Sequence, residues 1–434
     1  MAGKNSKQVS EYTPSAFHLL SKPSGAVCNL DCKYCFFLSK EALYPGSNFR
    51  MSDDMLESYI SQLLESHISN DVNVAWQGGE PMLMGMDFFK TSIELAKKYK
   101  RPEQRILHTI QTNGVLIDDE WAKFFKENNY LVGLSVDGPK EIHDEFRVRK
   151  DGKGTFDQVM RGWEKLVKHE VDCNILCTLH SANADKPLRI YNFFRNEMNA
   201  EYIQFIPIIE RATEETLPIA NRGWGERTDR PLYIQKGELV TERSIQPEQY
   251  GRFYIELFDE WVRKDVGKIF IQMFDVTLGS YLGEYSLCIH SPTCGTALAM
   301  EHNGDIYSCD HFVEPDYLLG NINDTPMFEL VTSEKQMKFG ADKSDTLPDY
   351  CNKCSVKFSC NGGCPKDRFI KTPKGEPGLN YLCEGYKMFF NHVNKPMKIM
   401  ADLINNGRYA DEIMEIYRKD GEEAENPAVK TLMN

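Results

Sequence analysis

The sequence predicts an α/β fold: a partial (β/α)6, TIM-like barrel, then a cysteine-rich domain and a C-terminal helical tail. Two observations favour this class. From about residue 16 to 210, short β-rich runs alternate with longer runs of helical period, which is typical of βα units in a parallel sheet. Eight cysteines then occur within residues 288–383, in turn-rich sequence. Six strand–helix units fit an open barrel better than a closed one of eight, and such folds gather their chemistry at the C-terminal ends of the strands.

Six strands and five helices are expected in the first part of the chain. The expected strands are Ala16–Leu20, Val72–Gln77, Arg105–Thr112, Tyr130–Val136, Asp172–Leu179 and Tyr202–Ile209. The expected helices are Asp53–Ser66, Met86–Tyr99, Asp118–Glu127, Thr155–Lys168 and Pro187–Asn196. These helices place apolar residues at i, i+3 and i+4, so each has an apolar stripe that can cover the sheet.

The strand–helix pattern breaks after Ile209. Residues 210–245 are polar and rich in Arg and Glu, and we expect a long loop or excursion there rather than a core element. A helix, Pro247–Lys264, and a β-like run, Lys268–Phe274, follow. The expected domains are a barrel at 13–245, a connecting helix and strand at 246–287, a cysteine-rich domain at 288–385 and a helical tail at 386–434. We expect the last fifteen residues of the tail to be disordered.

The composition is that of an ordinary globular protein. The chain has 434 residues, of which 41% are hydrophobic and 26% are charged, and its net charge is −13. This apolar content supports a sizeable core and excludes a disordered chain. The acidic balance argues against a protein that coats nucleic acid or binds an anionic membrane. The N-terminus has no apolar signal region, and no apolar run is long enough to span a bilayer, so we expect a cytosolic protein.

Three cysteines follow the first expected strand directly, in the arrangement Cys28-x3-Cys32-x2-Cys35. Three thiolates on one short loop can hold three irons of a 4Fe–4S cubane and leave the fourth iron open to another ligand. A structural zinc site usually has four protein ligands, and the next candidate is His67. The alternative is therefore a zinc knuckle closed by a distant histidine.

Short motifs end the next three strands: QGGEP at 77–81, QTNG at 111–114 and SVDGP at 135–139. Together with the three cysteines they resemble the radical S-adenosylmethionine superfamily. The resemblance implies that the open iron chelates S-adenosylmethionine and that one electron cleaves it to a 5′-deoxyadenosyl radical. It also implies cofactor contacts at Gly78, Gly79, Glu80, Ser135 and Arg161. An ordinary turn residue is the alternative for Ser135, and a solvated helix residue is the alternative for Arg161.

The eight later cysteines form two neighbouring groups, Cys288-x5-Cys294-x14-Cys309 and Cys351-x2-Cys354-x5-Cys360-x3-Cys364-x18-Cys383. Eight thiols are the number that two sites of four thiolates each require. Two structural zinc ribbons are the alternative. Behind a radical S-adenosylmethionine barrel, the segment resembles the SPASM type of auxiliary-cluster domain.

The resemblance narrows to the anaerobic sulfatase-maturating enzymes, over about Phe17 to Tyr386. It rests on CNLDCKYCFF at 28–37, WQGGEP at 76–81, IQTNG at 110–114, GLSVDGPKEIHD at 133–144, NILC at 174–177 and CNGGC at 360–364. It implies one auxiliary 4Fe–4S cluster on Cys288, Cys294, Cys309 and Cys364, and another on Cys351, Cys354, Cys360 and Cys383. The spacing of the cysteines does not show this partition.

The same resemblance implies a reaction: oxidation of a Cys or Ser in the C/S-x-P/A-x-R motif of a sulfatase polypeptide to Cα-formylglycine. The radical takes a hydrogen atom from Cβ, a base takes the side-chain proton, and one electron leaves through an auxiliary cluster. Asp310 matches the base, for which we expect a pKa raised toward working pH; a solvated loop residue is the alternative. Gln77 matches a residue that places the substrate backbone. An electron donor such as flavodoxin or ferredoxin is expected as a partner.

Some features lie outside this pattern. Phe37 stands where some relatives carry Tyr, and the 210–245 segment is longer than a minimal member needs, so we expect it to cap the substrate groove or contact the client. Cys173 and Cys177 share one face of the fifth strand, and we interpret them as small buried hydrophobes rather than a redox pair. Two other functions remain open: a SPASM enzyme that forms thioether or carbon–carbon cross-links in a ribosomal peptide, and a non-catalytic iron–sulfur or zinc-stabilised protein.

Overall fold

A computed structural model describes residues 16–224 and 231–417. Its main feature is a ten-stranded sheet with the order β12-β11-β10-β1-β2-β3-β4-β5-β6-β9. All neighbours from β10 to β9 pair in parallel, whereas β11 and β12 are antiparallel. The strands are β1 (His18–Lys22), β2 (Asp71–Trp76), β3 (Arg105–Thr112), β4 (Tyr130–Ser135), β5 (Asp172–Leu179), β6 (Tyr202–Pro207), β9 (Phe270–Ile271), β10 (Ala297–Glu301), β11 (Asp305–Tyr307) and β12 (Leu318–Asn321).

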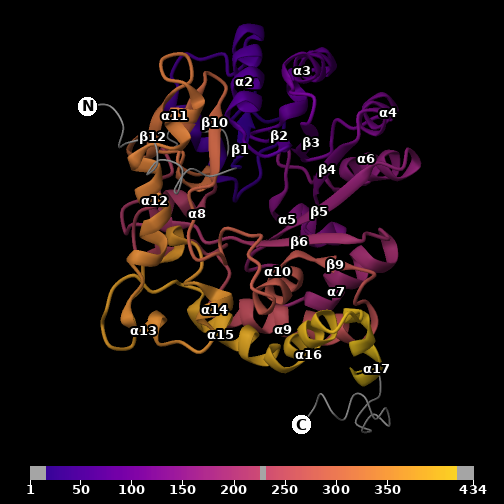
Figure 1. Cartoon of the computed structure of the whole chain (residues 1–434), viewed down its shortest axis with the longest axis vertical. Coiled ribbons are helices and arrows are strands. Elements are labelled where there is room, and N and C mark those ends of the chain that lie inside the picture. Colours follow the sequence, from indigo (N-terminus) through magenta and orange to yellow (C-terminus); the bar gives the residue numbers. More distant parts are fainter. Residues whose placement is uncertain (1–15, 225–230, 418–434) are drawn as a thin grey trace.

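Helices follow the barrel strands, and most of them lie on the outer side of the curved sheet (Figure 1). They are α2 (Asp53–Ser66), α3 (Met86–Tyr99), α4 (Asp119–Glu127), α5 (Lys140–Phe146), α6 (Phe156–Lys168) and α7 (Pro187–Asn192). The six predicted strands all form, each within two residues of its expected ends. The expected helix 187–196 is α-helical only to Asn192 and continues as a π-helical turn, Phe193–Glu197. The partial barrel is therefore confirmed.

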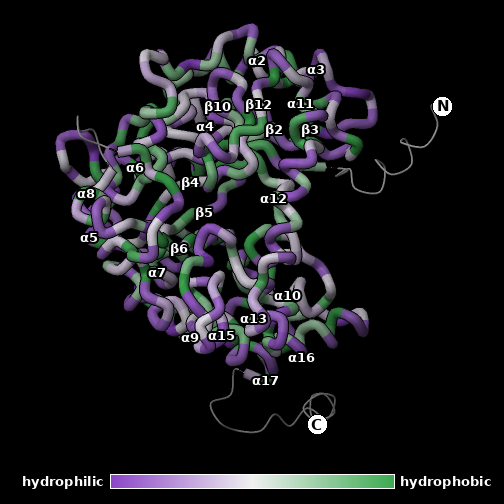
Figure 2. Tube along the Cα trace, turned by 90° about the vertical axis from the view of Figure 1, so that its left-hand side faces the viewer, coloured by the Kyte–Doolittle hydropathy of each residue, from purple (hydrophilic) through white to green (hydrophobic). Residues whose placement is uncertain are grey.

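The core lies between this sheet and its helices. Strand β2 is buried from Val72 to Trp76 except at Asn73, as a parallel strand covered on both faces must be. Trp76 meets the ring of Tyr59 from α2, with centroids 5.4 Å apart, and that of Phe89 from α3 at 5.9 Å. In Figure 2 the hydrophobic stretches follow strands such as β4, β5 and β6, while much of the periphery is hydrophilic.

The cysteine-rich region does not fold apart from the barrel. Its strand β10 pairs in parallel with β1, so that Lys22 lies opposite Glu301, and β11 and β12 extend the same sheet. Its helices are α11 (Met327–Val331), α12 (Glu334–Asp345), α13 (Asp349–Asn352) and α14 (Lys357–Cys360). A segment too small to bury a core of its own thus shares the sheet of the barrel.

Helices from the connecting segment and the tail cover the β6–β9 edge of the sheet (Figure 1). They are α9 (Pro247–Lys264), α10 (Gln272–Tyr281), α15 (Cys383–His392), α16 (Asn394–Asn405) and α17 (Ile413–Tyr417). Gly385 lets α15 approach α9 closely, because a Cβ there would lie 2.2 Å from the Pro247 carbonyl oxygen. The expected strand 268–274 was wrong: only Phe270–Ile271 is extended, and α10 begins at Gln272. The last fifteen residues lie outside the described ranges.

The 210–245 excursion has a small core of its own, contrary to the expected loop. It contains a two-stranded antiparallel ribbon, β7 (Arg211–Ala212) with β8 (Leu239–Val240), and a short helix, α8 (Leu217–Asn221). Its buried apolar residues are Ala212, Ala220, Trp224 and Tyr233. Aromatic residues in a mostly polar sequence supplied the contacts that periodicity did not reveal. No described helix is both long and apolar enough to cross a membrane.

Candidate active site

The three-cysteine loop, Cys28 to Cys35, lies at the C-terminal end of β1. Its three thiols are free and lie among the apolar side chains of Leu30, Phe146 and Ile208. Burial raises the pKa of the Cys28 thiol well above its usual value, and the charges of Glu80, Cys32 and Cys35 raise it further. The loop therefore holds neighbouring thiols in a low-dielectric pocket, where binding to iron would favour their deprotonated form.

This donor set fits an iron–sulfur cluster better than a single metal ion. Within residues 16–224 and 231–417, no group of three or more His, Cys, Asp or Glu side chains converges as the ligands of one ion do. A zinc ion needs its ligands at about 2.0 to 2.3 Å from one centre. In a cubane each thiolate binds a different iron, so the thiols lie further apart.

The glycines of the GGEP motif lie against the backbone that leads into the three-cysteine loop. The Gly79 amide donates to the Gly25 carbonyl at 2.8 Å, and a Cβ at Gly79 would lie only 2.0 Å from the carbonyl oxygen of Val27. Gly78 has φ +130°, a conformation that side chains disfavour. The motif thus joins the end of β2 to the loop by close backbone contact.

Glu80 links the end of β2 to the end of β3. Its fully buried carboxylate accepts hydrogen bonds from the Thr112 hydroxyl at 2.9 Å, from the Asn113 amide at 2.9 Å and from the Met82 amide at 3.1 Å. Burial raises the pKa of Glu80 to about 7. The Glu80 side chain faces these protein donors and holds Asn113 in place. The Asn113 side chain in turn donates to Asn29 at 2.7 Å and lies beside Cys28. Sequence reasoning did not single out Asn113.

The two other expected cofactor residues differ in their placement. Ser135 ends β4, is mostly buried, and its hydroxyl accepts a hydrogen bond from Gln111 at 3.0 Å. Arg161 is exposed on α6. Its neighbour Gly162 approaches the Gly114 carbonyl, which would lie 2.4 Å from a Cβ at that position. Ser135 therefore lies at the barrel mouth, while Arg161 is one residue from a contact with the QTNG turn.

Asp310 forms an ion pair with Lys22, the last residue of β1. The Lys22 side chain is only 2% exposed, and its ammonium lies 4.4 Å from the centre of the Phe37 ring. Burial raises the pKa of Asp310, but Lys22 and His311 outweigh it, so the net pKa lies below the usual value. The expectation of a raised pKa was wrong because sequence reasoning missed Lys22. Asp310 is an ionised carboxylate, held between the cysteine-rich region and the three-cysteine loop.

Gln77 lies on the neighbouring strand end. Its backbone amide donates to the Ser21 carbonyl at 2.9 Å. The side-chain oxygen of Gln77 is buried and has no hydrogen-bond partner within the described ranges. Because an unpaired buried acceptor costs about 1 to 3 kcal/mol, this oxygen suits a ligand that brings an N–H group.

The eight later thiols gather in two sets. Burial raises the pKa of Cys309 well above its usual value, and the nearby thiols of Cys364 and Cys288 add to the effect; Cys294 also lies near Cys288. The second set lines one small pocket and consists of Cys351, Cys354, Cys360 and Cys383. The eight thiols thus lie in two neighbouring groups of four.

Comparisons with known proteins agree with this site. Residues 23–194 match the radical SAM superfamily, and residues 288–355 match the SPASM iron-sulfur cluster-binding domain. A serine-type anaerobic sulfatase-maturating enzyme from Bacteroides thetaiotaomicron is 45% identical over 94% of this chain and 97% of its own length. The chain belongs to the anaerobic sulfatase-maturating enzymes. It is therefore a radical S-adenosylmethionine oxidoreductase, and its two domains imply S-adenosylmethionine and iron–sulfur clusters as cofactors.

Two further relatives of this family are similar. The cysteine-type anaerobic sulfatase-maturating enzyme of Clostridium perfringens is 36% identical over 86% of this chain and 95% of its own. The solved structure of native anSMEcpe with bound AdoMet and Cp18Cys peptide is 33% identical, with a TM-score of 0.75 over 89% of this chain and 99% of that one. The family fold is thus present along nearly the whole described chain.

The two remaining cysteines of this family member lie in the barrel wall. Cys177 is fully buried in the main core, and Cys173 is partly buried against it. Burial raises the pKa of both thiols, which disfavours the reactive thiolate. The interpretation as a small buried hydrophobe is confirmed for Cys177, whereas Cys173 is only partly buried.

Proposed function

We propose that this enzyme oxidises a Cys or Ser in the C/S-x-P/A-x-R motif of a sulfatase polypeptide to Cα-formylglycine, with S-adenosylmethionine and three 4Fe–4S clusters. The observation that carries the proposal is the place of Lys22. Its ammonium contacts Asp310, and its charge acts on the Cys35 thiol of the three-cysteine loop. Lys22 therefore lies near both the proposed base and the three-cysteine loop at the barrel mouth.

In this proposal Cys28, Cys32 and Cys35 hold the first cluster. The backbone at Gly78 and Gly79, with Glu80, Ser135 and Arg161, binds S-adenosylmethionine. When bound, the cofactor supplies a carbon-centred radical that can take a hydrogen atom. The apolar side chains around the loop exclude water from this space.

Asp310 accepts the proton of the substrate thiol or hydroxyl. The substrate loses a hydrogen atom from Cβ, this proton and one electron, so that a carbon–heteroatom double bond forms; a thioaldehyde then hydrolyses to the aldehyde. Because its pKa is lowered, Asp310 is ionised before the reaction, and Lys22 keeps the carboxylate in place. The unpaired oxygen of Gln77 accepts an N–H of the substrate backbone.

Cys288, Cys294, Cys309 and Cys364 would hold the auxiliary cluster that would take up the electron, and Cys309 directly precedes Asp310 in the sequence. The set Cys351, Cys354, Cys360 and Cys383 holds the other auxiliary cluster. Arg368 lies near thiols of both sets. Burial lowers the pKa of Arg368, and the thiols of Cys351, Cys364, Cys360 and Cys294 raise it. A carrier such as flavodoxin or ferredoxin reduces the first cluster.

The test is anaerobic incubation of the reconstituted enzyme with short sulfatase-motif peptides, followed by mass spectrometry. We expect an aldehyde that reacts with a hydrazine reagent. Identity with a serine-type relative favours activity on the Ser peptide, so Ser and Cys peptides are compared side by side. A cross-linked peptide without an aldehyde would support the peptide-modifying alternative instead.

Two variants test the roles. Asp310→Asn should lose peptide oxidation but retain cleavage of S-adenosylmethionine, whereas Asp316→Asn, at an exposed carboxylate nearby, should keep both. Cys28→Ala should abolish the cleavage and lower the iron content from about twelve to about eight per chain. A full formylglycine yield from Asp310→Asn would remove this residue from its role.

A further inference from the structure

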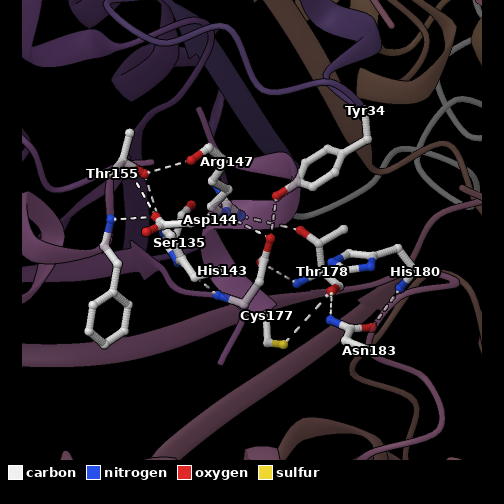
Figure 3. A network of polar contacts seen from close by, with 12 residues as sticks. Tyr34, Ser135, His143, Asp144, Arg147, Thr155, Cys177, Thr178, His180 and Asn183 are labelled. Atoms are coloured by element: carbon white, nitrogen blue, oxygen red, sulfur yellow. Dashed lines mark hydrogen bonds and ion pairs between the residues drawn. The ribbon is translucent and has the colours of Figure 1, made fainter. Parts of the chain in front are cut away.

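A buried polar network ties the three-cysteine loop to the ends of β4 and β5 (Figure 3). We propose that Arg147, held by Asp137 and Tyr34, positions this loop and makes the cluster bound there easier to reduce. The proposal rests on the first cluster of the proposed function. It assigns Arg147 and Tyr34 as positioning residues, which do not touch the substrate.

Tyr34 is part of the loop itself, between Cys32 and Cys35. Its buried hydroxyl donates to Asp137 Oδ2 at 2.6 Å. The edge of its ring meets Phe146, with centroids 6.2 Å apart. One side chain of the loop is therefore held both by a charge-assisted hydrogen bond and by aromatic contact.

Asp137 is fully buried just beyond the end of β4. Its Oδ1 accepts the Thr178 amide of β5 at 2.9 Å, and its Oδ2 lies 2.9 Å from Arg147 Nε. Figure 3 shows Tyr34, Arg147 and Thr178 around this region of the network. A carboxylate in this position joins the loop to two strand ends at once.

Arg147 is 7% exposed and is connected to the loop in two ways. Its guanidinium carbon lies 5.5 Å from the centre of the Tyr34 ring, and its Nη2 donates to the Thr178 hydroxyl at 3.2 Å. The backbone on either side also meets the loop: the Lys33 amide donates to the Phe146 carbonyl at 3.0 Å, and the Asp31 amide to the Val148 carbonyl at 2.8 Å. Backbone hydrogen bonds therefore join the loop to the segment 146–148.

The buried guanidinium of Arg147 stands beside the part of the loop that carries two of the thiols. It lies 5.5 Å from the ring of Tyr34, which stands between Cys32 and Cys35 in the sequence. Phe146, the residue before Arg147, packs in one apolar cluster with Cys32 and Tyr34. A thiolate-ligated cluster gains a negative charge when it is reduced, so a buried cation beside two of its thiolates favours the reduced state.

The chain contains a matched control away from the cysteines. Tyr191 donates to Asp265 Oδ2 at 2.7 Å, and Arg195 Nη1 donates to the same oxygen at 2.9 Å. The guanidinium carbon of Arg195 lies 5.1 Å from the centre of the Tyr191 ring. This group has the same three residue types in a similar arrangement, and no cysteine is among the groups that shift the pKa of Arg195. Variants in it therefore report a loss of folding stability without an effect on the cluster.

The experiment uses reconstituted full-length enzyme and follows the electron paramagnetic resonance signal that changes on addition of S-adenosylmethionine. For Arg147→Gln we expect a ratio of reduced to oxidised cluster about tenfold lower at fixed potential, a shift of about 59 mV for one electron. Tyr34→Phe should lose iron from this cluster several times faster on gel filtration. Arg195→Gln and Tyr191→Phe should change neither quantity.

If Arg147→Gln fails to fold, the double variant Arg147→Gln with Asp137→Asn removes both charges and retains hydrogen-bonding groups. It should also shift the potential downward, but less. Unchanged potentials in both Arg147 variants would overturn the proposal, as would an equal shift in Arg195→Gln. If Cys28→Ala binds as much iron as the wild type, the proposed first cluster itself fails, which distinguishes that outcome from failure of this inference alone.

Discussion

Removal of the Glu210 carboxylate should release the 210–245 excursion. Glu210 follows β6 and accepts hydrogen bonds from Trp224 at 2.6 Å, from the Thr241 hydroxyl at 2.7 Å and from Arg243 at 3.1 Å. The side chains of the Glu210–Arg243 pair are 3% and 6% exposed. One carboxylate therefore anchors both ends of the excursion.

The magnitude follows from what Glu210→Ala would leave behind. Breaking a buried ion pair by removing one partner costs about 3 to 5 kcal/mol, because the other charge stays buried. Arg243 keeps two carbonyl partners, those of Ala220 at 2.6 Å and Asn221 at 2.8 Å, so we expect the lower end, about 3 kcal/mol. Local opening of the excursion would expose Arg243 to water and so reduce the loss in the free energy of global unfolding. The opened excursion would then be cleaved more readily by protease.

Denaturant unfolding and limited trypsin digestion measure these two outcomes. Thr241→Val is the control, since it removes a single hydrogen bond and should cost about 1 kcal/mol. The excursion also reaches the site, because the Gln235 side chain donates to the carbonyl of His311, the neighbour of Asp310, at 3.3 Å. Glu210→Ala should therefore impair peptide oxidation more than cofactor cleavage. Wild-type stability together with wild-type digestion would refute this reasoning.

Two further predictions concern the site. Lys22→Met should lower the free energy of unfolding by about 3 to 5 kcal/mol, because it leaves the Asp310 carboxylate without its partner. Adding Asp310→Asn should recover much of that loss in denaturant unfolding. Purely additive effects of the two substitutions would contradict an energetic coupling between Lys22 and Asp310. Gly79→Ala should weaken S-adenosylmethionine binding about tenfold or more, since its Cβ would collide with the Val27 carbonyl oxygen. Gly152→Ala, whose Cβ meets open space, should leave equilibrium binding unchanged, and equal losses in both variants would count against the steric argument.

Much of the fold was predictable because short β-rich runs alternate along the chain with longer runs of helical period. Strands β3 and β5 form with the expected bounds, and the turn residues Asn113 and Gly114 directly follow β3. The extension of the sheet by β10–β12 was not predictable, because its pairing with β1 joins residues about 280 positions apart and leaves no local pattern. The small core of the excursion was missed for a similar reason.

The candidate site was only partly predictable. The cysteines, Gln77, Ser135 and Asp310 stand in or beside recognisable motifs, and Asn113 lies within QTNG, but Lys22 and Arg147 stand in none of the motifs. Lys22 and Asp310 are 288 residues apart, and nothing near either one indicates the other. The pKa of Asp310 depended on that distant charge, so its direction could not be derived from the motif.

The sequence by itself determined the six strands of the barrel and the family to which the motifs belong. Only the tertiary structure decided which thiols face one another. Cys360 and Cys364 are four residues apart, yet they join different sets. Between them Asn361, Gly362 and Gly363 have φ of +45°, +73° and +61°. Three successive residues in the left-handed region turn the chain sharply. Cys360 and Cys364 therefore belong to different sets although they are close in the sequence, whereas Cys309 and Cys364 lie near each other although they are distant in it.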